Sequence, residues 1–144
     1  MVKDKTLQEI IQGKTLIKLD ADATVQQAAV KMKEHRCGAI LIEEKGQLRG
    51  IFTERDMVFR VAAEGLSPQS TRLSQVMSTQ LVVGHPQDSH VRALNLMAAS
   101  GVRHLPVVDD SRVVGLVSRR QLMALDIELM DADIDKREAS RLFI

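Results

Sequence analysis

The chain has 144 residues, 44% of them apolar, and a formal net charge of +1, which suits one compact domain or two small ones that share a core. Aromatic residues make up only 2%, and this argues against binding of single-stranded nucleic acid, which depends on aromatic stacking. The near-neutral charge offers no electrostatic footprint for DNA, RNA or anionic lipid.

The single cysteine, Cys37, excludes an internal disulfide and a zinc site built from several cysteines. The amino terminus leads into no apolar signal segment, and no apolar run is long enough to cross a bilayer. We therefore expect no membrane partner and a soluble protein in a reducing, cytoplasmic setting.

The first half of the chain predicts six elements. They are a short helix over 6–11, a strand over 16–19, a helix from Thr24, a buried strand over 39–42, a return strand over 48–52, and a helix from Thr53 to about Glu64. Thr24 with Gln27 three residues on has the spacing of a capping box. Continuous apolar residues over 39–42 indicate a strand covered on both sides.

The second half predicts the same order after a linker at Gly65–Pro68. A strand over 81–83 is followed by a helix from Ser89 to about Gly101, strands over 105–108 and 113–117, and a last helix capped by Ser118. We place the two repeats at residues 1–66 and 67–130, with a helical tail at 131–144.

The two halves repeat one another at an offset of 65 positions. Gly50-Ile51-Phe52-Thr53-Glu54-Arg55-Asp56 returns as Gly115-Leu116-Val117-Ser118-Arg119-Arg120-Gln121. A unit of about 60 residues with three short strands buries too little surface to be stable alone. We therefore expect the two copies to pack against each other.

This pattern resembles a tandem pair of CBS (cystathionine-β-synthase) domains, of the stand-alone bacterial type. The resemblance covers residues 4–130 and rests on Gly50–Asp56 and on Gly101-Val102-Arg103-His104-Leu105-Pro106-Val107-Val108. It implies an α+β fold of two β-α-β-β-α repeats, each with an extra short helix, packed sheet to sheet with pseudo-twofold symmetry. It also implies a homodimer and an adenosine-type ligand, such as AMP, ADP, ATP or NAD, in the cleft between the repeats.

The family resemblance assigns the ribose to Asp56 and the phosphate to Thr53. It places Ile51 nearby and adenine against Leu81 and Val82. In the facing segment that starts at Val102, it brings Arg103 and His104 to the phosphates, with Arg55 as a weaker phosphate candidate. Two plainer interpretations stay open. Thr53 and Asp56 have capping-box spacing, which needs no ligand, and Arg103 and His104 are also what a solvated strand start would contain.

The second copy has Gln121 where the first has Asp56. Gln121 can still close a capping box with Ser118, but it has no carboxylate for a ribose. Hydrogen bonds to charged groups are roughly twice as strong as neutral ones. We therefore expect one good nucleotide site at Asp56 and a weak or empty one at Gln121.

The sequence favours a regulatory, signal-transducing module that acts on an unknown effector protein. The alternative is a ligand-free dimerisation or scaffold module. We expect no enzyme, no catalytic cofactor and no metal site, because the sequence contains no nucleophile–base pair and its four histidines lack zinc spacing.

Overall fold

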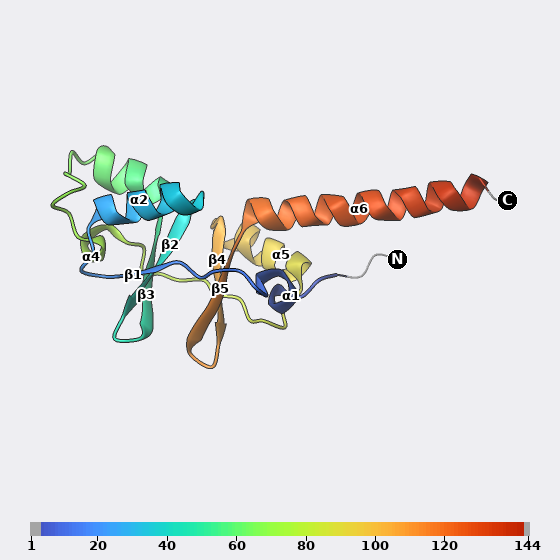
Figure 1. The fold of residues 1–144 in the computed structure, drawn as a ribbon, viewed down its shortest axis with the longest axis horizontal. Coiled ribbons are helices and arrows are strands. Elements are labelled where there is room, and N and C mark those ends of the chain that lie inside the picture. Colours follow the sequence, from blue (N-terminus) through green and yellow to red (C-terminus); the bar gives the residue numbers. More distant parts are fainter. Residues whose placement is uncertain (1–3, 143–144) are drawn as a thin grey trace. The chain divides into compact units, whose positions relative to one another are not determined.

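The structure, a computed structural model, describes residues 4–142, without the side chains of residue 133 and of residues 135–142. The fold is α+β (Figure 1). The elements in chain order are α1 (Leu7–Ile11), β1 (Lys18–Asp20), α2 (Val25–His35), β2 (Ala39–Glu44), β3 (Gln47–Thr53), α3 (Glu54–Asp56), the π-helix η1 (Met57–Ala62), α4 (Leu73–Val76), α5 (His90–Ser100), β4 (His104–Asp109), β5 (Arg112–Ser118) and α6 (Arg119–Leu142).

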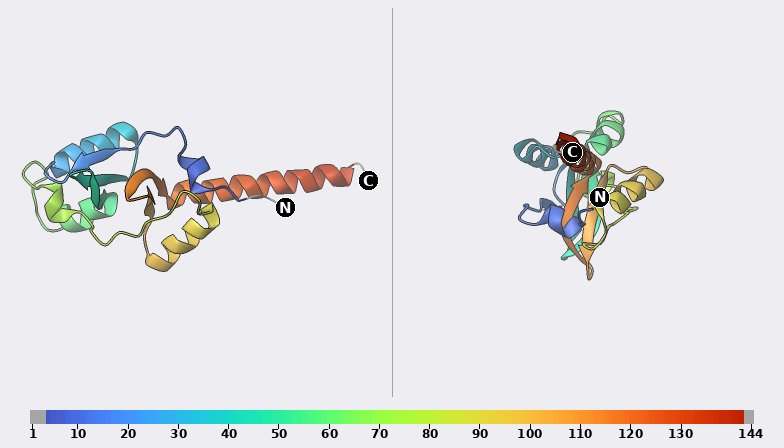
Figure 2. Two further views of the ribbon diagram at one scale, coloured as in Figure 1. Left: turned by 90° about the horizontal axis from the view of Figure 1, so that it is seen from below. Right: turned by 90° about the vertical axis from the view of Figure 1, so that its right-hand side faces the viewer.

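The last helix, α6, runs without interruption across residue 130, where the sequence places the start of the tail. Its first turns lie beside α5, and it then continues well beyond α5 as one straight helix (Figures 1 and 2). The tail residues 143 and 144 lie outside the described part of the chain.

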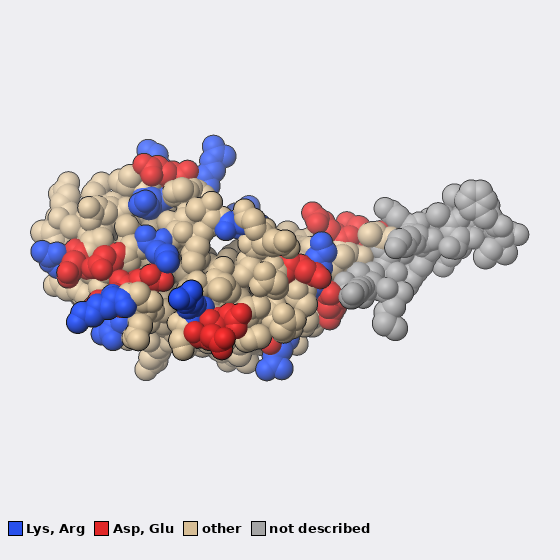
Figure 3. Space-filling view, turned by 60° about the horizontal axis from the view of Figure 1, so that its bottom comes forward, with Lys and Arg blue, Asp and Glu red and all other residues tan. Residues whose placement is uncertain are grey.

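Charged side chains are mixed in sign on the surface. On the face drawn in Figure 3, Lys and Arg lie among Asp and Glu, in keeping with a net charge of +1. Among the residues that the structure describes, no helix is both long and apolar enough to cross a membrane.

The chain forms two compact units whose composition differs from the order of the sequence repeats. One unit comprises residues 15–81 and 110–113; the other comprises 82–109, the residues from 114 onward and those before 15. The unit with the first repeat's sheet therefore contains α4, and the unit with the second repeat's sheet contains α1. The boundaries proposed from the sequence follow the repeat, whereas these units follow packing.

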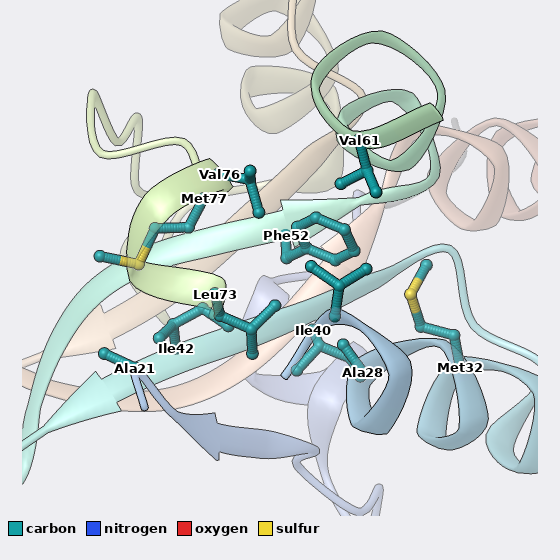
Figure 4. Packing of buried hydrophobic residues seen from close by; sticks show 11 residues of the cluster. Ala21, Ala28, Met32, Ile40, Ile42, Phe52, Val61, Leu73, Val76 and Met77 are labelled. Carbon is teal, nitrogen blue, oxygen red and sulfur yellow. The ribbon is translucent and has the colours of Figure 1, made fainter. Parts of the chain in front are cut away.

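The first repeat builds a three-stranded sheet. β1 pairs with β2 in parallel, and β2 pairs with β3 in antiparallel orientation. Figure 4 shows how α2, α4 and η1 cover one side of this sheet with aliphatic side chains around the fully buried Phe52. The core is aliphatic apart from this phenylalanine, in keeping with the scarcity of aromatic residues in the sequence.

The second repeat builds only a two-stranded sheet, β4–β5, so the strand predicted over 81–83 is wrong. What remains of the third strand is a bridge at Gly84, whose N–H donates to the Pro106 carbonyl and whose carbonyl accepts from the Val108 N–H, both at 2.8 Å. Pro106 is the physical reason why this third strand is lost. In the first repeat the Leu41 N–H donates to the Ile17 carbonyl at 3.3 Å. The equivalent residues in the second repeat are Pro106 and Val82, and Pro106 has no N–H to donate to the Val82 carbonyl.

The predicted helix caps are confirmed. Thr24 and Gln27 form a reciprocal capping box at the start of α2. Ser89 accepts from the Arg92 N–H at the start of α5. The helix predicted from Thr53 to Glu64 is shorter than expected and is α-helical only over α3, because its backbone widens into η1 from Met57.

A glycine in each repeat admits the close approach of a short helix. A Cβ at Gly50 would lie 2.7 Å from Met77 Sδ and 2.9 Å from the Ser78 carbonyl oxygen. A Cβ at Gly115 would lie 2.6 Å from Ile11 Cγ2. The repeated glycine is therefore required where α4 ends on β3 and where α1 ends on β5.

We predict that Gly115→Ala lowers the free energy of unfolding by about 1–3 kcal/mol, because the added methyl overpacks against Ile11. Ile11→Ala alone should cost about 2–5 kcal/mol. The double variant should lose clearly less than the sum, since removing the Ile11 side chain makes room for the methyl. Urea denaturation of the four proteins measures this coupling.

Gly50→Ala combined with Ile11→Ala is the matched control. A methyl at residue 50 would meet Met77 rather than Ile11, so these two losses should add. Additive losses for the Gly115 and Ile11 pair would contradict the packing described above.

Candidate functional site

Asp56 is a buried carboxylate at the turn from β3 into the helix. Thr53 ends β3 and is the N-cap of α3, with an extended backbone. The Asp56 N–H donates to Thr53 Oγ1 at 3.2 Å, and the Thr53 N–H donates back to Asp56 Oδ2 at 3.0 Å. This reciprocal capping box fixes the side chain of Asp56, which is 6% exposed.

The carboxylate has donors on both oxygen atoms. Oδ2 accepts from the Thr53 N–H and also from the Thr53 hydroxyl at 3.2 Å. Oδ1 accepts from the Ser78 hydroxyl at 3.1 Å and forms an ion pair with Arg60 Nε at 3.5 Å. An ionised carboxylate has about four lone-pair sites, so the three hydrogen bonds occupy most of its accepting capacity.

Ser78 and Arg60 are themselves held in place. The Ser78 N–H donates to the Ile51 carbonyl at 2.9 Å, and the Ile51 N–H donates to the Ser78 carbonyl at 3.0 Å. Arg60 Nη1 donates to the Met77 carbonyl at 3.0 Å. The cluster of Asp56, Arg60 and Ser78 thus joins β3, η1 and the segment after α4 within one unit.

The second repeat keeps the cap without the carboxylate. The Gln121 N–H donates to Ser118 Oγ at 3.1 Å, and Gln121 Oε1 accepts from the Ser118 N–H at 3.4 Å. The first residue of the helix is also held in the same way in the two copies. The Glu54 N–H donates to the Gly38 carbonyl at 3.0 Å, and the Arg119 N–H donates to the Arg103 carbonyl at 2.8 Å. The backbone design persists in both copies, and the charged oxygen pair is present only in the first.

The predicted site residues fall into two groups, one in each compact unit. Ile51, Thr53, Arg55, Asp56 and Leu81 belong to the first unit, and Val82, Val102, Arg103 and His104 belong to the second. Ile51 and Asp56 are buried, Thr53, Leu81, Val82, Val102 and His104 are half-buried, and Arg55 and Arg103 are exposed. The union of all nine in a single site stays a prediction.

Two of these residues have structural neighbours that the sequence did not suggest. The Arg55 guanidinium lies 4.9 Å from the centre of the Phe59 ring, a cation–π contact on an exposed surface. Val102 packs against the core around Met97 and Leu105. Arg55 is therefore engaged along its own helix, which weakens it as a phosphate ligand.

The surroundings of His90 and Cys37 indicate structural roles for both side chains. His90 is 1% exposed; its Nδ1 accepts from the Lys5 N–H at 3.2 Å, so Nε2 carries the proton that faces Asp126 Oδ1 at 3.0 Å. Burial raises the pKa of the Cys37 thiol, which disfavours a nucleophilic thiolate. Among the described residues no group of three or more His, Cys, Asp or Glu side chains is arranged to hold a metal ion.

Sequence reasoning missed two members of the Asp56 cluster. Arg60 lies four residues after Asp56, and opposite charges at this spacing on a helix are a visible signal. Ser78 lies 22 residues away from Asp56, and its contact depends on the pairing of its segment with Ile51. No local pattern in the sequence predicts that pairing.

Comparison with known proteins gives the family. The family model for the CBS domain matches this chain twice, over residues 7–63 and 73–128. The chain belongs to the CBS domain family. The CBS domain-containing protein YhcV of Bacillus subtilis is 46% identical over 95 residues, which span 66% of this chain and 67% of that relative. Matches to two further relatives span about half of their lengths, 50% and 54%.

Solved CBS structures share the fold. The CBS domain protein NE2398 superposes with a TM-score of 0.81 at 30% identity, over 87% of this chain and 99% of that one. The CBS domain pair of MJ0100, solved with 5′-methylthioadenosine and S-adenosyl-L-methionine, gives a TM-score of 0.75 over 85% of this chain and 96% of its own. At 22% identity the latter shows the common fold alone. The chain is thus a CBS pair, a regulatory module.

The Asp56 cluster predicts unequal stability effects at equivalent positions of the two CBS repeats. Asp56→Ala removes the cap and leaves Arg60 and Ser78 without their acceptor, so we expect a loss of about 2–4 kcal/mol in the free energy of unfolding. Gln121→Ala removes a neutral cap and should cost about 1 kcal/mol. Urea denaturation compares the two, and equal losses would contradict the cluster described here.

Proposed function

We propose that this CBS pair is a regulatory, signal-transducing module that binds an adenine nucleotide, with the Asp56 carboxylate accepting hydrogen bonds from the ribose. One observation carries the proposal: the first repeat places a buried carboxylate where the second repeat achieves the same helix cap with a neutral amide. The cap uses Oδ2 of Asp56. Oδ1 is engaged only by side chains outside the cap, and a carboxylate oxygen at this position suits a ligand with adjacent hydroxyl groups.

The backbone at Val82 supports the adenine end of the proposal. Pro106 cannot donate the ladder hydrogen bond that Leu41 donates in the first repeat. The Val82 carbonyl is therefore not used by residue 106 of β4. A carbonyl beside half-buried aliphatic side chains is suited to an adenine, which has an amino donor and an apolar face.

The remaining predicted residues retain the roles that the family resemblance implies. Arg103 is exposed at the start of β4, where a guanidinium suits a phosphate. The adenosine compounds bound to the MJ0100 pair agree in chemistry with a ribose-binding carboxylate. We propose a non-catalytic, cytoplasmic protein that uses the nucleotide as a signal for an effector protein, with no role for nucleic acid, a membrane or a catalytic cofactor.

We predict that purified protein binds at least one of AMP, ADP, ATP and NAD in isothermal titration calorimetry. Asp56→Asn keeps the volume of the side chain and removes its charge, so affinity should fall about tenfold or more. Gln121→Ala is the matched control at the equivalent position of the second repeat, and it should leave the affinity unchanged. Absence of heat with all four compounds, or equal binding by Asp56→Asn, would defeat the proposal.

A separate observation favours the alternative function, a dimerisation module. Four apolar side chains on α6 are between 43% and 57% exposed: Met123, Ile127, Met130 and Ile134. Their spacing of four, three and four residues is that of a coiled-coil seam. We propose that this stripe pairs with the same stripe of a second copy, giving a homodimer.

We predict a dimer in analytical ultracentrifugation that Ile127→Asp converts to monomer, because a carboxylate in an apolar seam loses its hydration without a partner. Ala132→Asp is the control, since residue 132 lies off the seam at the outward heptad position. A wild-type monomer, or a dimer that both variants retain, would count against the α6 interface.

A further inference from the structure

Three hydrogen bonds occupy most of the accepting capacity of the Asp56 carboxylate before any ligand arrives. Thr53 supplies two donors to Oδ2, while Ser78 and Arg60 share Oδ1. A ribose that presents two hydroxyl groups needs acceptor sites on the same carboxylate. Binding therefore requires at least one existing partner to leave.

The partners on the two oxygen atoms are not equivalent. The donors on Oδ2 belong to the helix cap, and the cap has a counterpart in the second repeat that needs only one oxygen, Gln121 Oε1. Oδ2 is thus committed to the fold. Oδ1 is the atom available to a ligand, and its donors come from outside the cap.

Ser78 is the donor that can leave at the lower cost. Its hydroxyl is neutral, and rotation about one side-chain bond removes it from Oδ1 while its backbone stays paired with Ile51. Arg60 carries charge, and its second nitrogen stays bound to the Met77 carbonyl. A neutral hydrogen bond is also weaker than a charged one.

We propose, as an extension of the nucleotide-binding function, that the Ser78 hydroxyl is a placeholder for a ribose hydroxyl on Asp56 Oδ1 and sets the affinity and sugar specificity of the site. Ligand binding exchanges the Ser78 hydroxyl for a ribose hydroxyl, so the buried carboxylate keeps the same number of hydrogen bonds. Arg60 remains on Oδ1 and keeps the charge paired. The displaced Ser78 hydroxyl turns away from Oδ1, while the Ser78 backbone stays paired with Ile51.

The test uses AMP and its 2′,3′-dideoxy analogue as probes in calorimetry with the full chain. Ser78→Ala removes the competing hydroxyl, so AMP should bind about threefold to tenfold more tightly. The dideoxy analogue has no hydroxyl to place on Oδ1, and its affinity should be the same for wild type and variant. Ser74→Ala, an exposed serine on α4, is the matched control and should change neither affinity.

A purely structural role for Ser78 gives a different pattern, in which Ser78→Ala weakens both probes or alters both equally; either result overturns the inference. Unchanged or weaker AMP binding by Ser78→Ala overturns it as well. If Ser78→Ala does not fold, Ser78→Cys, whose thiol is a weak donor of similar size, should give the same gain. Failure of AMP to bind any of these proteins ends the inference, and the four-compound titration decides separately whether the nucleotide-binding function fails with it.

Discussion

The Asp56 carboxylate serves both the fold and the proposed ligand, and these two uses compete for its oxygen atoms. Three hydrogen bonds and one ion pair converge on a side chain that is 6% exposed. A buried charge is tolerated when its acceptor sites are filled, so removal of a donor without replacement costs stability. This constraint connects a helix cap, a π-helix and the segment after α4 to a single group.

In each unit, close packing of a short helix on a strand precedes the helix cap. Gly50 and Gly115 stand at equivalent positions of the repeat, and each admits the end of a short helix at a distance that a Cβ would forbid. At Gly50 this approach also brings Ser78 into pairing with Ile51, which places its hydroxyl on Asp56. The glycine of the repeated motif is therefore a packing requirement in both copies, and in the first copy it also delivers a residue to the candidate site.

The sequence predicted what depends on local chemistry. Capping boxes at Thr24 and Thr53, and the apolar strand that became β2, are decided by residues a few positions apart, and the 65-residue repeat predicted the CBS pair. The strand over 81–83 failed because Pro106, distant in sequence, cannot complete its ladder. Ser78 was missed for the same kind of reason, since its contact with Asp56 depends on tertiary pairing. The nine residues predicted for the site are divided between the two compact units, and their union in one site stays a prediction.

A crystal structure of the protein with AMP tests the central claim most directly. Our account predicts a ribose hydroxyl oxygen about 2.5–2.7 Å from Asp56 Oδ1, the length of a hydrogen bond to a carboxylate, with the Ser78 hydroxyl turned away and the Thr53 contacts on Oδ2 intact. A nucleotide bound elsewhere, or a ribose that leaves the Ser78 hydroxyl on Asp56, would contradict it.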